Sequence, residues 1–451
     1  MGAAGVPSED PVDGDGPREP VPRADAPEPG LPAGSPTEGV KHPAPDGSDD
    51  TDGSRAATPT VTPDEPVADG SAVVSESPAR GGLDRALRLV AVVGLLYAFL
   101  AGVYLLSSGI SGLGSGFADA LLDRVEHPLA GLAVGMLFTV LVQSSSVSTA
   151  AVVALVGTGV VPLSVAVPMV MGTNLGTTVT STLAALGNIG DKPAFRRGFA
   201  AATMHDMFNL LAVAILFPLE LATGVLQRAA TALTTVLPGG GEVSQPGPSP
   251  IRTAIRAPAN LAADLVERLG VQGAWAGVLL LLLGLLVIFA ALASITGQMR
   301  AAVGGNVEQT LNRSLSRGGG MLALAVGAGA TISVQSSTIV TAMLVPMVAS
   351  GILLLPNAFP ITLGANVGTT VTGLLASLAV DLPEGLTIAL VHSLFNVTAI
   401  LLIYPAKPIR QLPLRGAELL ADVAAERPSI VGAYVVGLFL VLPALVVLLA
   451  G

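Results

Sequence analysis

Two polar motifs occur twice in this chain, each time inside otherwise apolar sequence and at an identical offset. The tetrad Gln143-Ser144-Ser145-Ser146 returns as Gln335-Ser336-Ser337-Thr338, and the Gly-x-Asn-x-Gly-Thr-Thr motif around Asn174 returns around Asn366. A third pair follows in each copy, His205 to Asn209 and His392 to Asn396. The chain is therefore a duplicated unit. Duplication with hydroxyl residues in apolar segments is typical of secondary transporters that bind substrate and ions between two repeats.

The composition indicates a polytopic, all-α membrane protein. Hydrophobic residues make up 51% of the chain, charged residues only 12%, and the mean hydropathy is +0.70. Soluble globular proteins carry about a quarter charged residues. The chain has no cysteine, which excludes a disulfide framework and a cysteine metal site. We therefore expect the lipid bilayer as its surroundings and no nucleic-acid partner.

The predicted organisation begins with a tail that differs from the rest. Residues 1–82 are rich in Pro, Gly, Asp and Glu and cannot bury enough apolar surface to fold, so we expect a disordered acidic cytoplasmic tail. A plain solvated extension and a regulatory or docking role both stay open for it. The remaining predicted parts are a first transmembrane helix and connector (83–127), transport repeat 1 (128–222), an extracytoplasmic loop (223–272), a linking transmembrane helix and cytoplasmic loop (273–317), transport repeat 2 (318–405), and an amphipathic segment with a last transmembrane helix (406–451).

The distribution of basic residues predicts the orientation. Arginines precede the first apolar stretch, which places the N-terminus in the cytoplasm. Between the second and third motifs, repeat 1 carries Asp191 with three basic residues, whereas repeat 2 carries only Asp381 and Glu384. The three basic residues are Lys192, Arg196 and Arg197. Positive charge favours the cytoplasm, so the two loops should lie on opposite sides of the membrane. The sequence thus predicts two inverted repeats with broken or re-entrant helices, and leaves the side of the C-terminus open.

The chemistry of the motifs is that of a site for a small ion without a fixed counter-charge. No charged residue occurs in 128–190 or 318–380. Serines at a helix break offer hydroxyl and N–H donors, and helix N-termini favour phosphate-like anions. Side-chain oxygens and the carbonyls of unwound glycine segments are hard ligands for Na⁺. The alternative is that these small residues only pack helices together. The predicted Na⁺ ligands of the second motif are Asn174, Thr177, Asn366, Thr369 and Thr370.

Asp206 is the carboxylate inside the apolar part of the repeats, where burying it costs at least ~2.5–3.5 kcal/mol. Thr203, Asp206 and Asn209 are spaced by three, which predicts one helical face and a cation site. A structural Asp206, satisfied by neighbouring hydroxyls or by the nearby arginines, is the alternative. His205 and His392 are expected to hydrogen-bond within their own helices rather than to transfer protons.

These motifs resemble the signatures of the type II sodium-phosphate cotransporters and their bacterial relatives. The resemblance rests on both tetrads, both Gly-x-Asn-x-Gly-Thr-Thr motifs and the run from Phe195 to Asn209, and it covers about residues 85–450. It implies an inverted-repeat core, electrogenic sodium-coupled uptake of inorganic phosphate, a multi-pass protein of the cell membrane, and no cofactor beyond co-transported Na⁺.

By the resemblance, the tetrads line the phosphate and Na⁺ sites, and Thr203, Asp206 and Asn209 form a further Na⁺ site found in electrogenic members. Ala200 and Ala202 also follow the electrogenic version. Thr338 replaces a serine of the family pattern, and Ala365 stands where many relatives have serine, which leaves one ion ligand open. The cysteine-bonded outer loop of animal members is missing, which suggests a bacterial member. The residues expected at the phosphate and Na⁺ sites are Gln143, Ser144, Ser145, Ser146, Gln335, Ser336, Ser337 and Thr338.

The sequence also has to be compared with three other functions, which are transport of another oxyanion, phosphate sensing and serine hydrolysis. Hydroxyls and helix ends do not by themselves distinguish phosphate from another tetrahedral oxyanion, and a non-transporting phosphate sensor would also fit the acidic tail. An intramembrane serine hydrolase is disfavoured because the tetrads lack the Gly-x-Ser-x-Gly elbow, so we expect no enzyme.

Overall fold

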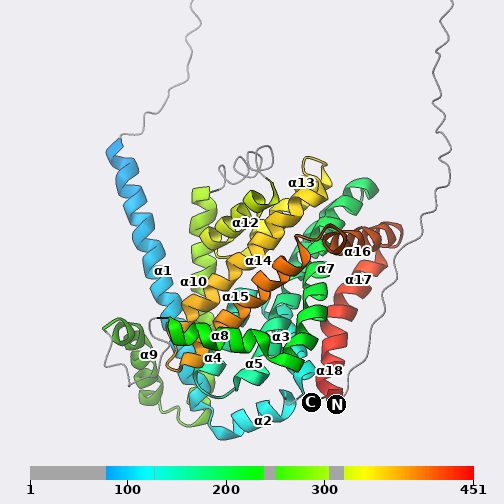
Figure 1. The fold of residues 1–451 in the computed structure, drawn as a ribbon. Helices are drawn as coiled ribbons and strands as arrows, with labels where there is room; N and C mark the ends of the chain where they lie inside the picture. The colour runs from blue at the N-terminus through cyan, green and yellow to red at the C-terminus, as the bar shows by residue number, and fades with distance from the viewer. Residues whose placement is uncertain (1–77, 126, 238–249, 304–318, 451) are drawn as a thin grey trace, which may run out of the picture. The chain divides into compact units, whose positions relative to one another are not determined.

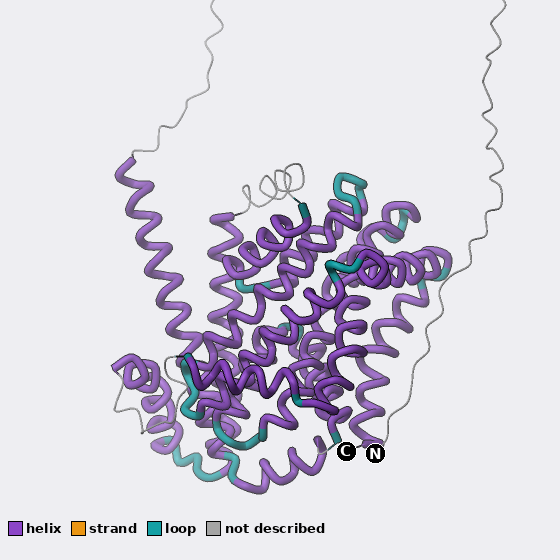
Figure 2. The backbone as a smooth tube through the Cα atoms, viewed as in Figure 1, coloured by secondary structure: helices purple, strands orange, loops and turns teal. Residues whose placement is uncertain are grey.

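The structure is a computed structural model that describes residues 78–125, 127–237, 250–303 and 319–450. Nearly all of the predicted tail and most of the predicted cytoplasmic loop after residue 303 lie outside these residues. The described part of the chain consists of helices joined by loops and turns and contains no strand (Figure 2). This confirms the all-α fold predicted from the composition.

The helices follow one another with short connections (Figure 1). In chain order they are α1 (Pro78–Gly112), α2 (Ser115–Val125), α3 (Pro128–Val142), α4 (Ser145–Gly157), α5 (Leu163–Leu175), α6 (Val179–Ala185), α7 (Lys192–Thr223), α8 (Val225–Val236), α9 (Pro250–Arg268), α10 (Ala274–Val303), α12 (Gly320–Val334), α13 (Ser337–Ala349), α14 (Leu355–Ser377), α15 (Pro383–Ile403), α16 (Lys407–Glu426), α17 (Ser429–Val436) and α18 (Leu442–Ala450). Two short 3₁₀ turns, Gly176–Thr178 and Leu186–Asn188, flank α6, and a π-helical segment, Gly437–Val441, joins α17 to α18.

Six helical segments of the described chain are long and apolar enough to cross a membrane, which confirms a multi-pass protein. A helix needs about 20 residues to cross the roughly 30 Å hydrocarbon core. The candidate spans are Val90–Gly112, Lys192–Thr223, Ala274–Gln298, Leu355–Ser377, Pro383–Ile403 and Ser429–Ala450. The C-terminal region therefore contains both an amphipathic helix, α16, and a span.

The two tetrads end short helices, as the sequence predicts. Helices α3 and α4 have 15 and 13 residues and meet at Gln143, and α12 and α13 have the same two lengths and meet at Gln335. At about 1.5 Å per residue, none of these four helices is long enough to cross the hydrocarbon core alone. The equal lengths show that the duplication extends from the sequence to the local structure. Whether the repeats are inverted in the membrane stays a prediction.

The Gly-x-Asn-x-Gly motifs are helical, which corrects the expectation of unwound glycine segments as Na⁺ ligands. In repeat 1 the motif ends α5 and tightens into the 3₁₀ turn Gly176–Thr178, whereas in repeat 2 it runs through α14 without interruption. The glycines allow helices to pack closely. A Cβ atom built on Gly172 lies 2.0 Å from the Leu132 carbonyl oxygen, and one on Gly364 lies 1.9 Å from that of Leu324. The glycines therefore bring α5 against α3 and α14 against α12.

The stretch predicted as an extracytoplasmic loop contains two helices, α8 and α9, on either side of residues outside the described chain. The Glu220 carboxylate accepts hydrogen bonds from the Leu226 N–H at 2.6 Å and the Gln227 N–H at 3.0 Å, and so caps the start of α8. Arg256 of α9 forms an ion pair with Asp381. The loop folds because both helices are amphipathic and pack one face on the membrane helices.

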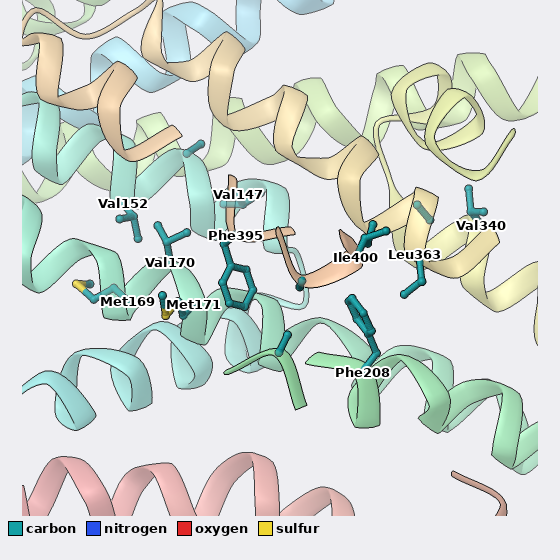
Figure 3. Packing of buried hydrophobic residues seen from close by; sticks show 14 of the residues in the cluster. Val147, Val152, Met169, Val170, Met171, Phe208, Val340, Leu363, Phe395 and Ile400 are labelled. Carbon is teal, nitrogen blue, oxygen red and sulfur yellow. The ribbon is translucent and has the colours of Figure 1, made fainter. Parts of the chain in front are cut away.

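The core joins helices from both copies of the duplicated unit. Figure 3 shows Val147 of α4, Val170 of α5 and Phe208 of α7 near Leu363 of α14 and Phe395 of α15, all of them buried in one cluster. Outside this core, α1 packs along α10 through glycines. A Cβ on Gly109 would lie 2.3 Å from the Leu281 backbone nitrogen. The two copies of the duplicated unit therefore share one packed interior.

Candidate functional site

The glutamine of each tetrad has an unusual backbone. Gln143 and Gln335 both have φ of 55° and are the non-glycine residues with positive φ in the described chain. Each is the C-cap of one helix, and the next residue is the N-cap of the following helix. This left-handed conformation is rare for a residue with a Cβ atom, and it reverses the chain over two residues. The backbone thus places the next N-terminus inside the apolar interior.

Each glutamine is bonded to the second motif of its own repeat. The Thr180 hydroxyl donates to Gln143 Oε1 at 2.8 Å, and the Thr372 hydroxyl donates to Gln335 Oε1 at 2.9 Å. The side-chain amide of each glutamine donates back to a carbonyl of the helix that it caps, Val140 or Ile332. The same pair of bonds in both copies shows that the two motifs form one local unit in each repeat.

The serines start helices α4 and α13. Ser144 is the N-cap of α4, and its hydroxyl oxygen accepts from the Val147 N–H at 3.3 Å. Ser336 has the same extended backbone, but its side chain makes no capping bond, which leaves the first amides of α13 for another acceptor. Ser145, Ser146 and Ser337 are buried. N-terminal amides and hydroxyls with the positive end of the helix dipole are suited to an anion.

Contacts between the two repeats bring the tetrads into one region. The Thr372 hydroxyl lies 3.4 Å from the Ser146 hydroxyl, so the second motif of repeat 2 reaches the tetrad of repeat 1. Ser181 and Thr341 share a hydrogen bond of 2.9 Å, which joins α6 to the helix that follows the other tetrad. The structure therefore brings together side chains that lie about 160 to 230 residues apart in sequence.

A buried amide network crosses the repeats near these tetrads. The Asn366 amide donates to the side-chain oxygens of Asn209 at 3.0 Å and Asn396 at 2.8 Å, and the Asn209 amide donates to the Asn174 carbonyl at 2.9 Å. The His392 Nε2 atom lies 3.3 Å from the Asn174 side-chain oxygen. His392 thus bonds to the opposite repeat, which corrects the expectation that its ring bonds within its own helix. The network gathers several amide oxygens of the kind that bind Na⁺.

The threonines of the second motif bond to their own helices. The hydroxyls of Thr177, Thr369 and Thr370 donate to the carbonyls of Thr173, Asn366 and Val367 at 3.0, 2.6 and 2.8 Å. A hydroxyl that donates in this way keeps its oxygen lone pairs, so it still offers a ligand to a cation. Their proposed role as Na⁺ ligands stays a prediction.

Asp206 is buried in α7, with 1% of its surface exposed. One carboxylate oxygen, Oδ2, accepts a hydrogen bond of 2.7 Å from the Tyr434 hydroxyl, and the other, Oδ1, has no partner in the described chain. The nearby arginines bond elsewhere, Arg196 to Asp422 and Arg197 to the Ala349 carbonyl. Neither arginine therefore bonds to this carboxylate, which rules out the alternative that Arg196 or Arg197 satisfies Asp206.

The three residues of the predicted α7 cation face have different neighbours. The Thr203 hydroxyl donates to the Phe199 carbonyl at 2.9 Å, and Asn209 belongs to the amide network, whereas Asp206 faces Tyr434. No hydrogen bond joins these three described side chains to one another. The sequence reasoning missed Tyr434 because no motif marks it. Its one signal is a hydroxyl in an apolar C-terminal span.

The chain is similar in sequence to known proteins. A family model described as Na⁺/Pi-cotransporter matches residues 98–236 and 276–412. The chain is 32% identical to sodium-dependent phosphate transport protein 2A of Rattus norvegicus over 430 residues, which covers 80% of this chain and 67% of the relative. It is 31% identical to protein 2B of Homo sapiens over 444 residues, which covers 79% of this chain and 64% of the relative.

No solved structure gives a significant match. The chain spans about two thirds of the length of these relatives. The family model covers both copies of the tetrads and of the second and third motifs, and more than half of the chain. This chain belongs to the Na⁺/Pi-cotransporter family.

Proposed function

We propose that this chain is a sodium-coupled symporter that takes up inorganic phosphate across the cell membrane, with its N-terminus in the cytoplasm. The observation that carries the proposal is the pair of glutamine-braced tetrads, each of which opens a helix N-terminus in the interior near the other repeat. The named relatives, which are sodium-dependent phosphate transport proteins, support the choice of phosphate and Na⁺.

Phosphate would be held by neutral donors. The tetrad segments contain no lysine or arginine, and both nearby arginines, in the first turns of α7, are bonded to other groups. Hydroxyls and N-terminal amides of Ser144 to Ser146 and Ser336 to Thr338 then bind the anion without a fixed cation. Co-bound Na⁺ supplies the positive charge, which explains why uptake of one requires the other.

The amide network and Asp206 would bind Na⁺. Amide and hydroxyl oxygens at the interface of the repeats are hard ligands, and the free Asp206 Oδ1 adds a formal charge. A site that uses the carboxylate makes a third Na⁺ possible for each divalent phosphate. Such a cycle moves one net positive charge inward and responds to the membrane potential by about 2.3 kcal/mol per 100 mV.

The test is uptake of labelled phosphate into proteoliposomes that contain the purified chain, with an inward Na⁺ gradient or with K⁺ in its place. We expect uptake only with Na⁺, and loss of uptake in the Ser144→Ala/Ser336→Ala double variant. Ser333→Ala is the matched control, because Ser333 lies two residues before Gln335 and its exposed hydroxyl bonds to the Gly329 carbonyl of its own helix. Equal uptake of sulfate would favour a general oxyanion transporter, and phosphate binding without uptake would favour a sensor.

The electrogenic part of the proposal has its own test. Replacing Asp206 with Gly should make uptake insensitive to a valinomycin-set potential and should lower the number of Na⁺ ions transported per phosphate by one. Unchanged voltage dependence in a variant that still transports would show that Asp206 is structural, while leaving phosphate symport intact.

A further inference from the structure

Asp206 receives its one described hydrogen bond from the C-terminal span. Tyr434 lies in α17, 228 residues further along the chain, and its hydroxyl is 2.7 Å from Asp206 Oδ2. The region matched by the family model ends at residue 412, so this partner comes from outside that region. A hydroxyl bonded to a buried carboxylate is a strong, charge-assisted interaction.

Aromatic packing fixes the tyrosine ring in this position. Its ring meets Phe199 edge-on at 6.5 Å, and Phe439 edge-on at 5.4 Å. Phe199 lies seven residues before Asp206, on the same face of α7. The ring is therefore held by α7 on one side and by its own helix on the other. Its hydroxyl has a fixed direction, toward the carboxylate.

The helix that carries Tyr434 is otherwise peripheral. Most residues of the span Ser429–Ala450 are not buried, yet Phe439 is 2% exposed and Tyr434 is partly buried. The turn after Tyr434 is π-helical over Gly437–Val441, and such segments are frequent at functional sites. An apolar cavity of about 360 Å³ lies beside it, between α3, α7 and α18. The span therefore contacts the other helices along one side, through Tyr434 at Asp206 and through Phe439 against Met136 and Leu175.

The bond leaves one oxygen of the carboxylate unused. Asp206 Oδ1 is buried and has no partner in the described chain. A purely structural Asp–Tyr pair would be expected to satisfy both oxygens, because a buried unpaired acceptor destabilises the protein. The carboxyl torsion of aspartate is broad, so a donor on Oδ2 determines where Oδ1 points.

We propose that Tyr434 is a positioning residue for cation binding, which holds Asp206 so that Oδ1 faces the Na⁺ site. This inference rests on the proposed function, because it takes Asp206 as a Na⁺ ligand. The C-terminal span then belongs to the transport site, although it lies at the edge of the helix assembly. Preorganising the carboxylate raises Na⁺ affinity because the ordering is complete before the ion arrives.

The experiment compares Tyr434→Phe with the wild-type chain in the same proteoliposomes. The variant keeps the ring that packs on Phe199 and Phe439 and removes only the donor. We expect the Na⁺ concentration for half-maximal uptake to rise about tenfold, as for loss of a hydrogen bond to a charged group. The maximal rate and the half-saturating phosphate concentration, both at saturating Na⁺, should stay near the wild-type values. A loss of fold would instead lower the maximal rate.

Two further variants make the test specific. Tyr404→Phe is the matched control, because Tyr404 packs against Phe359 and under Arg410, away from Asp206, and it should keep wild-type Na⁺ dependence. In an Asp206→Gly background, Tyr434→Phe should cause no additional shift. An equal shift with and without the carboxylate would overturn the proposal.

The outcomes separate this proposal from the function that it depends on. A wild-type chain without Na⁺-driven uptake overturns the function, whereas normal wild-type uptake with an unshifted Tyr434→Phe variant overturns only the role of Tyr434. If the Tyr434→Phe variant does not reach the membrane, an infrared measurement on the wild-type chain tests the proposal instead. Its Na⁺-induced infrared difference spectrum should contain a tyrosine C–O band that Asp206→Gly lacks. Absence of the band in the wild type overturns the proposal.

Discussion

The two tetrad glutamines combine an unfavourable backbone with a repeated hydrogen bond. A residue with a Cβ atom in the left-handed region costs about 1–2 kcal/mol, and glycine would remove that cost. Glutamine is nevertheless present at both positions, and its Oε1 atom accepts from Thr180 or Thr372. Strain of this kind persists where it serves the site, so the amide must do more than cap a helix.

Replacing Gln335 with Gly should therefore separate stability from transport. Relief of the backbone strain and loss of the bond to Thr372, worth about 1 kcal/mol, offset each other, so the apparent melting temperature should change by only a few degrees. Phosphate uptake should fall about tenfold, because the serine N-terminus loses its brace. Thermal unfolding in detergent and uptake in vesicles measure the two effects. Full uptake by the glycine variant would show that Gln335 serves only as a helix cap.

At the scale of elements, glycines determine how closely the helices of each repeat pack. Gly172 and Gly364 occupy equivalent places in the second motif, and in both a Cβ would collide with a carbonyl of the partner helix. Gly135 and Gly327 make the reciprocal contacts from α3 and α12, each with a Cβ position 2.0 Å from a carbonyl. The short tetrad helices are therefore held in place by helix pairs that tolerate no added side chain.

Gly364→Ala should destabilise the chain by several kcal/mol, because the new methyl group forces α14 away from α12. The matched control is Gly329→Ala in α12, where a Cβ meets no atom within 4 Å. That substitution should be neutral or stabilise by up to about 1 kcal/mol through helix propensity. Thermal unfolding of both variants decides the point. Equal melting temperatures would show that the close approach is not needed.

Elements also show where sequence reasoning succeeds and where it stops. The breaks at Gln143 and Gln335 were predictable, because polar tetrads interrupt apolar runs that are too long for one helix. The uninterrupted course of α14 through the second motif could not be predicted from the sequence. Gly364 is equally compatible with an unwound segment and with close helix packing, and only the position of the partner helix distinguishes the two. The contact between Asp206 and Tyr434 joins residues with no shared motif or period, so only the tertiary structure reveals it.

At the scale of the whole molecule, the basic and acidic loops make separate contacts. Arg196 pairs with Asp422 of α16, and Arg197 donates to the Ala349 carbonyl at the end of α13, whereas Asp381 pairs with Arg256 of α9. Figure 1 shows α16 beside one end of α7, and α9 beside α1. The charge rule assigns these two groups of contacts to opposite sides of the membrane.

Cysteine labelling tests this antiparallel arrangement in a chain that has no native cysteine. Lys192→Cys should resist an impermeant thiol reagent applied outside intact cells, and Glu384→Cys should react. Both residues are exposed, and neither position disturbs the bonds of Arg197. Permeabilised cells are the control, since both cysteines should then react. Labelling of both positions in intact cells would contradict the inverted topology.

The glycine contact between α1 and α10 has a consequence for biosynthesis. About 160 residues separate the end of α1 from the start of α10, and their surfaces fit so closely that Gly109 and Gly277 leave no room for a side chain. At about 5–20 residues per second, a ribosome takes roughly 10–30 seconds to make that stretch. During this time the surface of α1 that matches α10 has no partner from α10 to pack against. The order of synthesis therefore makes α10 the element whose arrival completes the packing of the first span.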